Sequence, residues 1–153
     1  MKNSIKHSII YAVVVFVGSA LLSAESKHSA SNQPLDDLVA IQTALAGDTL
    51  AHVSHHAAAI SKAASEHKLH GLSADVASQA AKVAESKNLK SARHWFKPLS
   101  KSFVDYLAAH PDKSGKYNVA YCPMAKASWI QKGAAIRNPY FGKSMLNCGT
   151  IKK

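Results

Sequence analysis

The sequence predicts an all-α protein, an antiparallel four-helix bundle with an irregular Cys/Met-containing tail packed on it. Two observations predict this fold class. Between about residues 34 and 110, four segments carry apolar residues at alternating spacings of three and four, and short breaks join them. From about residue 117 to 150 the helical period disappears, but apolar and aromatic residues stay too frequent for a disordered segment. We therefore expect the tail to pack on the bundle.

The first two predicted helices lie on either side of a short polar break. Pro34 favours a helix start, and Asp36 and Asp37 place carboxylates near the positive end of the helix dipole. The sequence Gly-Asp-Thr at 47–49 ends this helix and caps the next one. The apolar stripes are Leu35, Leu38, Ile41 and Leu45 in the first helix, and Leu50, Val53, Ala57, Ile60 and Ala64 in the second.

The third and fourth predicted helices complete the bundle. Ser73 is a suitable N-cap for the third, and Pro98 lies inside the fourth, where we expect it to kink the helix or tilt its first turns. The stripes are Val76, Ala80 and Val83 in the third helix, and Leu89, Ala92, Phe96, Leu99, Phe103, Tyr106 and Leu107 in the fourth. Because the seams are rich in alanine, the core is thin and would gain from a covalent or metal staple.

Residues 1–24 have the layout of a secretory signal peptide. Lys2 and Lys6 precede an apolar run at 9–22, and a small-residue cleavage site ends at Ala24. The apolar run is short for a membrane span, so we expect no stable span after cleavage, and an uncleaved anchor is the alternative. The predicted location is the periplasm.

After the signal, a flexible leader at 25–33 precedes one domain at 34–153. Without Lys2 and Lys6 the chain has 17 basic and 9 acidic residues, a formal charge of +8. The lysines are spread along the chain with little aromatic interleaving, which argues against nucleic-acid binding. A solvated basic surface is the simpler interpretation of this charge, and attraction to an acidic partner or to an anionic membrane face is a further consequence that it allows.

Two sulfur pairs stand in the predicted tail. Cys122 and Met124 flank a proline, and Met145 and Cys148 are three residues apart. Thiolate and thioether donors together select Cu(I) or Ag(I) over harder ions, whereas methionine is a poor zinc ligand. The turn-forming sequence at 138–142 allows the second pair to return toward the first. These four residues are the predicted metal site.

A disulfide is the competing interpretation of the same residues. Two cysteines in an exported chain tend to pair. A bridge between Cys122 and Cys148 would close a loop of about 27 residues and stabilise the fold by about 3–4 kcal/mol in the chain-entropy treatment. The methionines would then fill core space. Both interpretations hold together if reduction opens the site, and the sequence leaves both open.

Three histidines form a secondary candidate metal site. His52, His55 and His56 fall in the second predicted helix, and His52 and His56 are one turn apart, a spacing that can chelate Cu(II), Ni(II) or Zn(II). All three lie away from the apolar stripe, which favours a solvated face. The sequence contains no paired-carboxylate, Ser/His/Asp or phosphate-loop motif, so it predicts no enzyme.

Several motifs resemble the DUF3347 family of bacterial envelope domains. They are Tyr-Cys-Pro-Met-Ala at 121–125, Trp-Ile at 129–130, Ile-Arg-Asn-Pro-Tyr-Phe-Gly-Lys-Ser-Met-Leu-Asn-Cys-Gly at 136–149, and Ala-Arg-His-Trp-Phe-Lys-Pro-Leu-Ser at 92–100. Members occur alone or fused to periplasmic adaptor subunits of copper/silver-type heavy-metal efflux systems. The resemblance implies a helical bundle with a Cys/Met segment, no enzymatic activity, and an efflux adaptor or other envelope protein as partner.

Two functions follow from these observations. The first is an exported non-enzymatic protein that holds Cu(I) or Ag(I) through Cys122, Met124, Met145 and Cys148 in connection with heavy-metal handling or efflux. The second is an envelope interaction domain with no metal role, stapled by a disulfide between the two cysteines.

Overall fold

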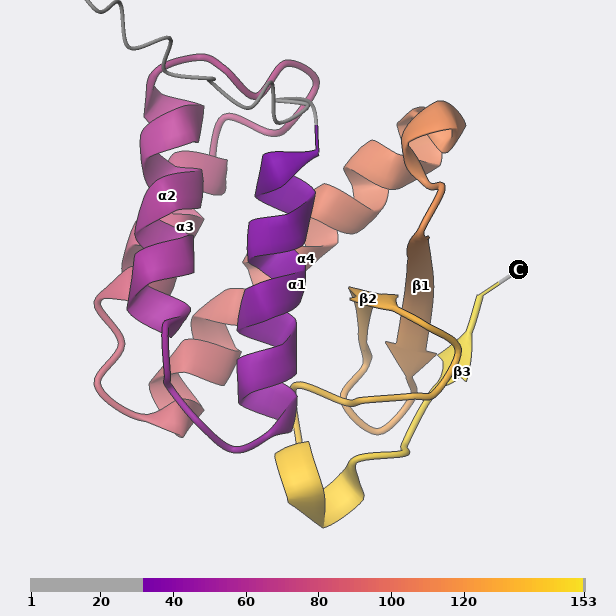
Figure 1. Ribbon diagram of the computed structural model, residues 1–153. Helices are drawn as coiled ribbons and strands as arrows, with labels where there is room; N and C mark the ends of the chain where they lie inside the picture. The colour runs from indigo at the N-terminus through magenta and orange to yellow at the C-terminus, as the bar shows by residue number, and fades with distance from the viewer. Residues whose placement is uncertain (1–31, 153) are drawn as a thin grey trace, which may run out of the picture.

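The computed structural model describes residues 32–152, in which four helices precede a small antiparallel sheet (Figure 1). The helices are α1 (Gln33–Ala46), α2 (Val53–Ser65), α3 (Val76–Ala84) and α4 (Leu89–Ala109). The predicted signal peptide and the predicted leader up to residue 31 lie outside the described residues. Within residues 32–152, no helix combines the length and apolarity that crossing a membrane requires.

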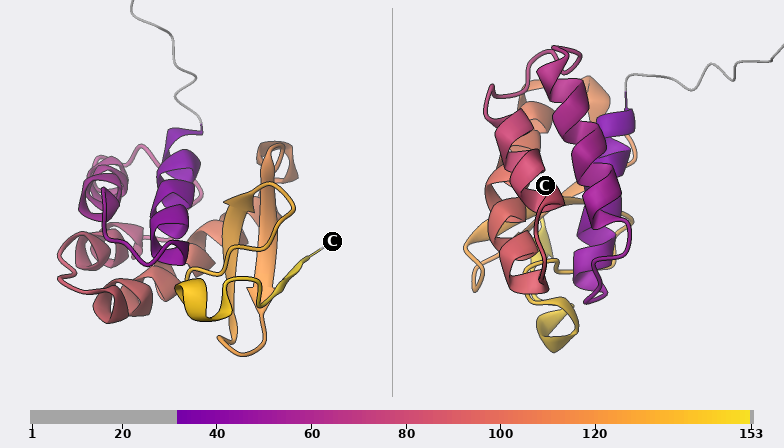
Figure 2. Two further views of the ribbon diagram at one scale, coloured as in Figure 1. Left: turned by 60° about the horizontal axis from the view of Figure 1, so that its bottom comes forward. Right: turned by 90° about the vertical axis from the view of Figure 1, so that its left-hand side faces the viewer.

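The four predicted helices are present, and their apolar stripes form the core. α2 packs on α1 and α3, and α4 packs on α3 (Figure 2). The second helix begins later than its stripe suggests, because the Thr49 hydroxyl accepts a hydrogen bond from the Ala51 amide and His52 adopts a left-handed φ of 60°. Fully buried stripe residues include Leu38, Ile41, Leu45, Ile60, Val76, Val83, Phe96, Leu99 and Phe103.

The prediction of an all-α fold with an irregular tail is wrong. The tail forms three strands, β1 (Tyr117–Cys122), β2 (Ala127–Lys132) and β3 (Thr150–Ile151). Their order in the sheet is β2-β1-β3, and both pairings are antiparallel. Ala120 stands opposite Trp129 on one side and Ile151 on the other, so strands far apart in sequence meet at β1.

In the tail, strands pair with other segments of the chain, and the helical periodicity of the sequence does not reveal such pairings. A turn at 123–126 reverses the chain, with Lys126 at a φ of 49° and its amide donating to the Pro123 carbonyl. β1 then pairs with β2 along its whole length. The buried positions of β1 do not alternate strictly, because Tyr117 is buried on the face that also carries half-buried Val119 and Tyr121, while Ala120 and Cys122 are buried on the other face. The alternation in the sequence is therefore weak.

Strand β2 closes the open side of the bundle, contacting both α1 and α4. In Figure 1 the sheet stands beside α1, below the upper end of the diagonal α4. Trp129 is fully buried, and its ring lies edge-on to Tyr140 with centroids 5.9 Å apart. The Trp129 indole donates to the Gln131 side chain at 2.9 Å, which satisfies its polar atom within the core. This tryptophan is a core residue.

Candidate metal centre

The sheet brings the two cysteines together. Cys122 is the last residue of β1, and Cys148 stands two residues before β3. Because Tyr121 pairs with Thr150, the two strands carry their cysteines to the same end of the sheet, and the sulfur atoms lie 2.8 Å apart. Cys122 is buried, Cys148 is half-buried, and both are free thiols in this structure. The arrangement can support a disulfide or a two-thiolate metal site.

One buried side chain holds the loop that returns Cys148 to β1. Asn138 is fully buried, and its amide group donates to the Cys148 carbonyl at 2.8 Å. Its side-chain oxygen accepts from the Tyr140 backbone at 2.8 Å, and its own backbone amide donates to the Leu146 carbonyl at 2.7 Å. Asn138 therefore fixes both arms of the loop between β2 and β3, and with them the position of Cys148.

An arginine of α4 ties the same loop to the helices. The Arg93 guanidinium donates to the Pro139 carbonyl at 2.9 Å and to the Leu45 carbonyl at 2.8 Å, and it pairs with Asp48. The Arg93 hydrogen bond, together with the Lys143 backbone amide, holds the pKa of Asp48 below its usual value. The guanidinium thus links α1, α4 and the tail at one point.

Two glycines let the backbone pass close to other groups. Gly142 has a φ of 58°, and a Cβ there would overlap the Asp48 carboxylate and the Arg93 guanidinium. Gly149 has a φ of 140°, and a Cβ there would lie 2.7 Å from the Trp129 ring. Glycine tolerates such backbone conformations, and here it also leaves the required space. The residues that position the sulfur pair are therefore glycines and buried polar groups.

The two thiols differ in their proton affinity. Burial alone would raise the pKa of Cys122, but hydrogen bonds from the Cys148 thiol, from the Ala125 and Met124 amides and from Asn138 lower it on balance. The pKa of Cys148 is raised, chiefly because its proton serves the hydrogen bond to Cys122. Cys122 is thus the thiol that ionises first, and a thiolate is the form that binds soft metals.

Both methionines of the predicted site lie at the surface. Met124, in the turn between β1 and β2, is 67% exposed, and Met145, at the end of the short 3₁₀ helix η2 (Gly142–Met145), is 36% exposed. Among residues 32–152 these are the only large apolar side chains that are exposed. Core packing therefore does not explain them. Both flank the cysteines in the chain, and the Cys148 amide donates to the Met145 carbonyl at 3.0 Å.

The histidines of the secondary site do not join the sulfur pair. His52 and His55 are exposed, and His56 is half-buried with its Nδ1 2.8 Å from the Asp37 carboxylate. The rings of His55 and His56 meet edge to face at 5.3 Å. Within the described range, no three His, Cys, Asp or Glu side chains gather closely enough to hold a metal ion.

Asn138 was predicted only as part of a turn, and its buried hydrogen bonds were not foreseen; no role was predicted for Arg93 or Gly149, which also position the pair. The signals that the sequence offered were an arginine inside a helical motif and an asparagine before a proline.

Compared with family models, curated proteins and solved structures, the chain has no match. The resemblance to the DUF3347 family stays a prediction that rests on the motifs given above.

Proposed function

We propose that this chain is an exported, non-enzymatic protein that binds Cu(I) or Ag(I) through Cys122 and Cys148, with Met124 and Met145 completing the site. The observation that carries this proposal is the exposure of the two methionines. They are the exposed large apolar side chains of the described residues, and each flanks one member of the adjacent cysteine pair in sequence. A stabilising role in the core does not account for that coincidence.

The donor set suits a soft monovalent ion. Two thiolates from adjacent cysteines can hold Cu(I) or Ag(I), and binding releases the thiol protons. The lowered pKa of Cys122 favours this release, because less free energy is then needed to remove the thiol proton when the metal binds. Thioethers need no deprotonation, and surface thioethers let an ion arrive or leave without unfolding the sheet. The site thus fits a carrier or a sequestering protein.

The proposed setting is the periplasm, with a heavy-metal efflux adaptor or another envelope protein as partner. The signal-like residues 1–24 support export. The resemblance of the tail motifs to the DUF3347 family supports a connection with copper or silver efflux. Neither point supports an enzymatic activity.

A competition titration tests the metal site. Reduced protein is titrated with Cu(I) held by a chromophoric chelator, and transfer is read from the loss of the chelate colour. We expect one Cu(I) per chain, abolished in the double variant Cys122→Ser with Cys148→Ser. The exposed double variant Met124→Leu with Met145→Leu should bind about ten-fold more weakly while keeping its melting temperature.

A matched pair of histidine changes serves as the control. His52→Ala with His55→Ala removes two exposed imidazoles and should leave Cu(I) affinity unchanged. If the methionine variant binds as tightly as the wild type, the thioethers have no part in the site. If the cysteine variant still binds Cu(I), the sulfur site is the wrong one.

A disulfide-stapled interaction domain is the second candidate. The direct contact of the sulfur atoms at 2.8 Å and the complete burial of Cys122 favour it. This alternative expects no Cu(I) binding and a loss of about 3 kcal/mol of unfolding free energy on reduction. Denaturant unfolding with and without reductant, run beside the Cu(I) titration, separates the two candidates.

A further inference from the structure

A groove between α4 and the sheet is lined by a cluster of positively charged side chains. Its volume is about 490 Å³. Its rim carries four lysines, Lys97, Lys101, Lys126 and Lys152, and we call it the basic groove. We propose that the basic groove binds an acidic peptide segment of a partner protein, with an apolar side chain of that segment on the groove floor. This proposal does not depend on metal binding.

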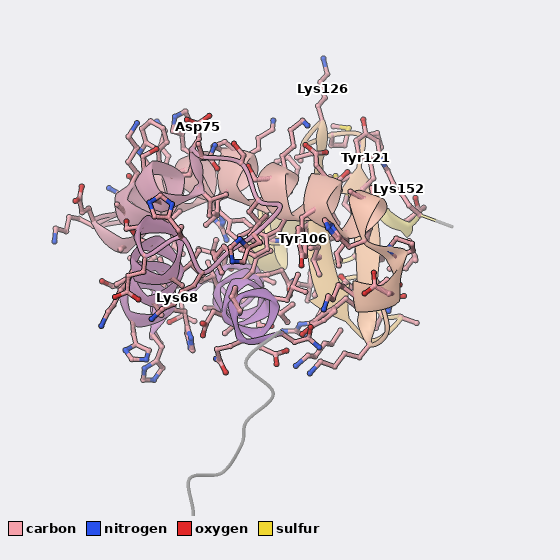
Figure 3. The ribbon with its side chains drawn as sticks, turned by 90° about the horizontal axis from the view of Figure 1, so that it is seen from above. Lys68, Asp75, Tyr106, Tyr121, Lys126 and Lys152 are labelled. Carbon is pink, nitrogen blue, oxygen red and sulfur yellow. The ribbon has the colours of Figure 1, made fainter. Side chains whose placement is uncertain are left out.

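The rim lysines come from separate elements that the fold brings together. Lys97 and Lys101 are one turn apart on α4, Lys126 ends the β1–β2 turn, and Lys152 follows β3. Figure 3 shows Lys126 extending into solvent on the same side of the molecule as Lys152 and Tyr121. No stretch of the sequence is densely basic, so the cluster exists only in the folded chain.

Most of this charge is free to meet a ligand. Asp105 is the one acidic residue of the lining, and it pairs with Lys101 at 2.5 Å. Among the described residues, Lys97, Lys126 and Lys152 have no carboxylate partner within 4.0 Å. The Lys97 ammonium donates to the Ala125 carbonyl, and the Lys152 ammonium lies 5.0 Å from the centre of the Tyr121 ring. Such positioned but unpaired cations favour carboxylates.

The floor of the basic groove is apolar. Pro98 and Val104 of α4 face Tyr121 and Ala127 of the sheet across it. An apolar side chain can lie on this floor while acidic neighbours in the same segment reach the rim. A groove of this volume falls within the usual range for ligand sites, roughly 300–1,000 Å³. The combination of apolar floor and cationic rim matches a peptide that mixes acidic and apolar residues.

A peptide fits better than a lipid surface or a nucleic acid. Membrane surfaces are bound by large apolar side chains that insert, and the exposed ones of the described residues, Met124 and Met145, do not line the groove. Single-stranded nucleic acid needs successive aromatic platforms, and the lining offers the single ring of Tyr121. Because Lys126 stands two residues after Met124, a docked partner would lie beside the sulfur site.

The test uses a fluorescein-labelled decapeptide of alternating aspartate and glutamate with one central phenylalanine. Fluorescence anisotropy measures its binding to the full mature protein at low and at moderate salt. The variant Lys126→Glu with Lys152→Glu should weaken binding by at least about ten-fold. The matched control Lys62→Glu with Lys87→Glu makes the same change in net charge on exposed lysines outside the groove, and it should retain most of the affinity.

Two further measurements use the wild-type protein and do not depend on the stability of a variant. Amide NMR shifts on peptide addition should concentrate at Tyr121, Ala127 and Ser128. Replacing the phenylalanine of the peptide by glycine should weaken binding several-fold, because the floor loses its contact. Equal loss in both lysine variants, shifts spread over α2 and α3, or tighter binding to phosphatidylglycerol vesicles than to the peptide would each overturn the proposal.

Discussion

The helical half of this protein and its C-terminal sheet are stabilised in different ways. In α1, α2 and α3, buried aliphatic side chains such as Leu38, Ile60 and Val76 repeat at helical spacing, and each has apolar neighbours. In the sheet region, single polar groups and glycines decide the course of the chain, above all Asn138 and Gly142. The helical half is therefore stabilised by many similar apolar contacts, whereas the path of the chain in the sheet half depends on individual residues.

This difference has a functional consequence. The sulfur pair belongs to the half whose geometry depends on single contacts, so small changes there should move the cysteines or release the tail. Changes of similar size in the helical core should lower stability only by the packing that they remove. Substitutions of equal chemical size in the two halves therefore test the comparison directly.

The largest effect is expected for Gly142→Ala. The added Cβ would overlap the Asp48 carboxylate and the Arg93 guanidinium, at a φ of 58° that alanine also disfavours. We expect a loss of about 3–5 kcal/mol of unfolding free energy, because the link between the tail and the helices must open. Urea unfolding followed by circular dichroism measures it.

Gly133→Ala provides the matched control. Gly133 also has a positive φ, 76°, but nothing lies within 4 Å of an added Cβ. It should lose only about 1 kcal/mol, the cost of the left-handed backbone. Equal losses at the two glycines would mean that the contact with Asp48 and Arg93 is not what holds the tail.

A smaller but still large effect is expected for Asn138→Ala. The change removes the hydrogen bond to the Cys148 carbonyl and leaves buried backbone groups of the loop unpaired. We expect a loss of about 2–4 kcal/mol in denaturant unfolding and a faster alkylation of Cys148. Asn118→Ala, which removes one exposed hydrogen bond to the Gly133 carbonyl, should cost less than about 1 kcal/mol.

In the helical half, Ile60→Val should have a modest effect. Ile60 is fully buried, and the change removes one methylene from a core of aliphatic neighbours. We expect a loss of about 1 kcal/mol and an unchanged alkylation rate at Cys148, because the tail does not depend on this site. A change in thiol reactivity would show that the two halves are coupled more strongly than their contacts suggest.

The smallest effect concerns a carboxylate at the junction of the two halves. Burial opposes ionisation of Asp36, but hydrogen bonds from Lys132, Tyr117 and Lys116 outweigh it and lower the pKa to about 2. A folded-state pKa below the unfolded value of 3.8 gives stability that is present above about pH 4 and is lost as the pH falls toward 2.

The contribution should be below about 1 kcal/mol, because Asp36 is partly solvated. Asp36→Asn should therefore be slightly less stable at neutral pH and show a flatter stability profile between pH 4 and 2. Thermal unfolding across this range measures both. Identical pH profiles for the variant and the wild type would show that the lysines and Tyr117 do not stabilise the ionised form.

The sequence predicted the helices because their signal is local. Leu35, Leu38 and Ile41 carry the period of the helix that contains them, whatever the rest of the chain does. The sheet was missed because β1 is defined by partners elsewhere in the chain, at Trp129 and at Ile151. Its half-covered faces also weaken the alternation that marks a strand.

The candidate site was predicted in part. The cysteines and the turn-forming residues before Met145 can be recognised in the sequence, and in the structure the two sulfur atoms lie side by side. The role of Arg93 could not be predicted, because its partners are backbone carbonyls of segments 45 residues or more away. The surface position of Met124 depends on the sheet turn and was equally hidden.

The most direct test of the metal proposal is a free-thiol count on the mature protein from export-competent cells, reduced and then given one equivalent of Cu(I) in a competing chelator. The account predicts that Cys122 and Cys148 are both alkylated without Cu(I) and both protected with it. Protection should weaken when Met124 and Met145 are leucine. Equal alkylation with and without Cu(I) would contradict the account.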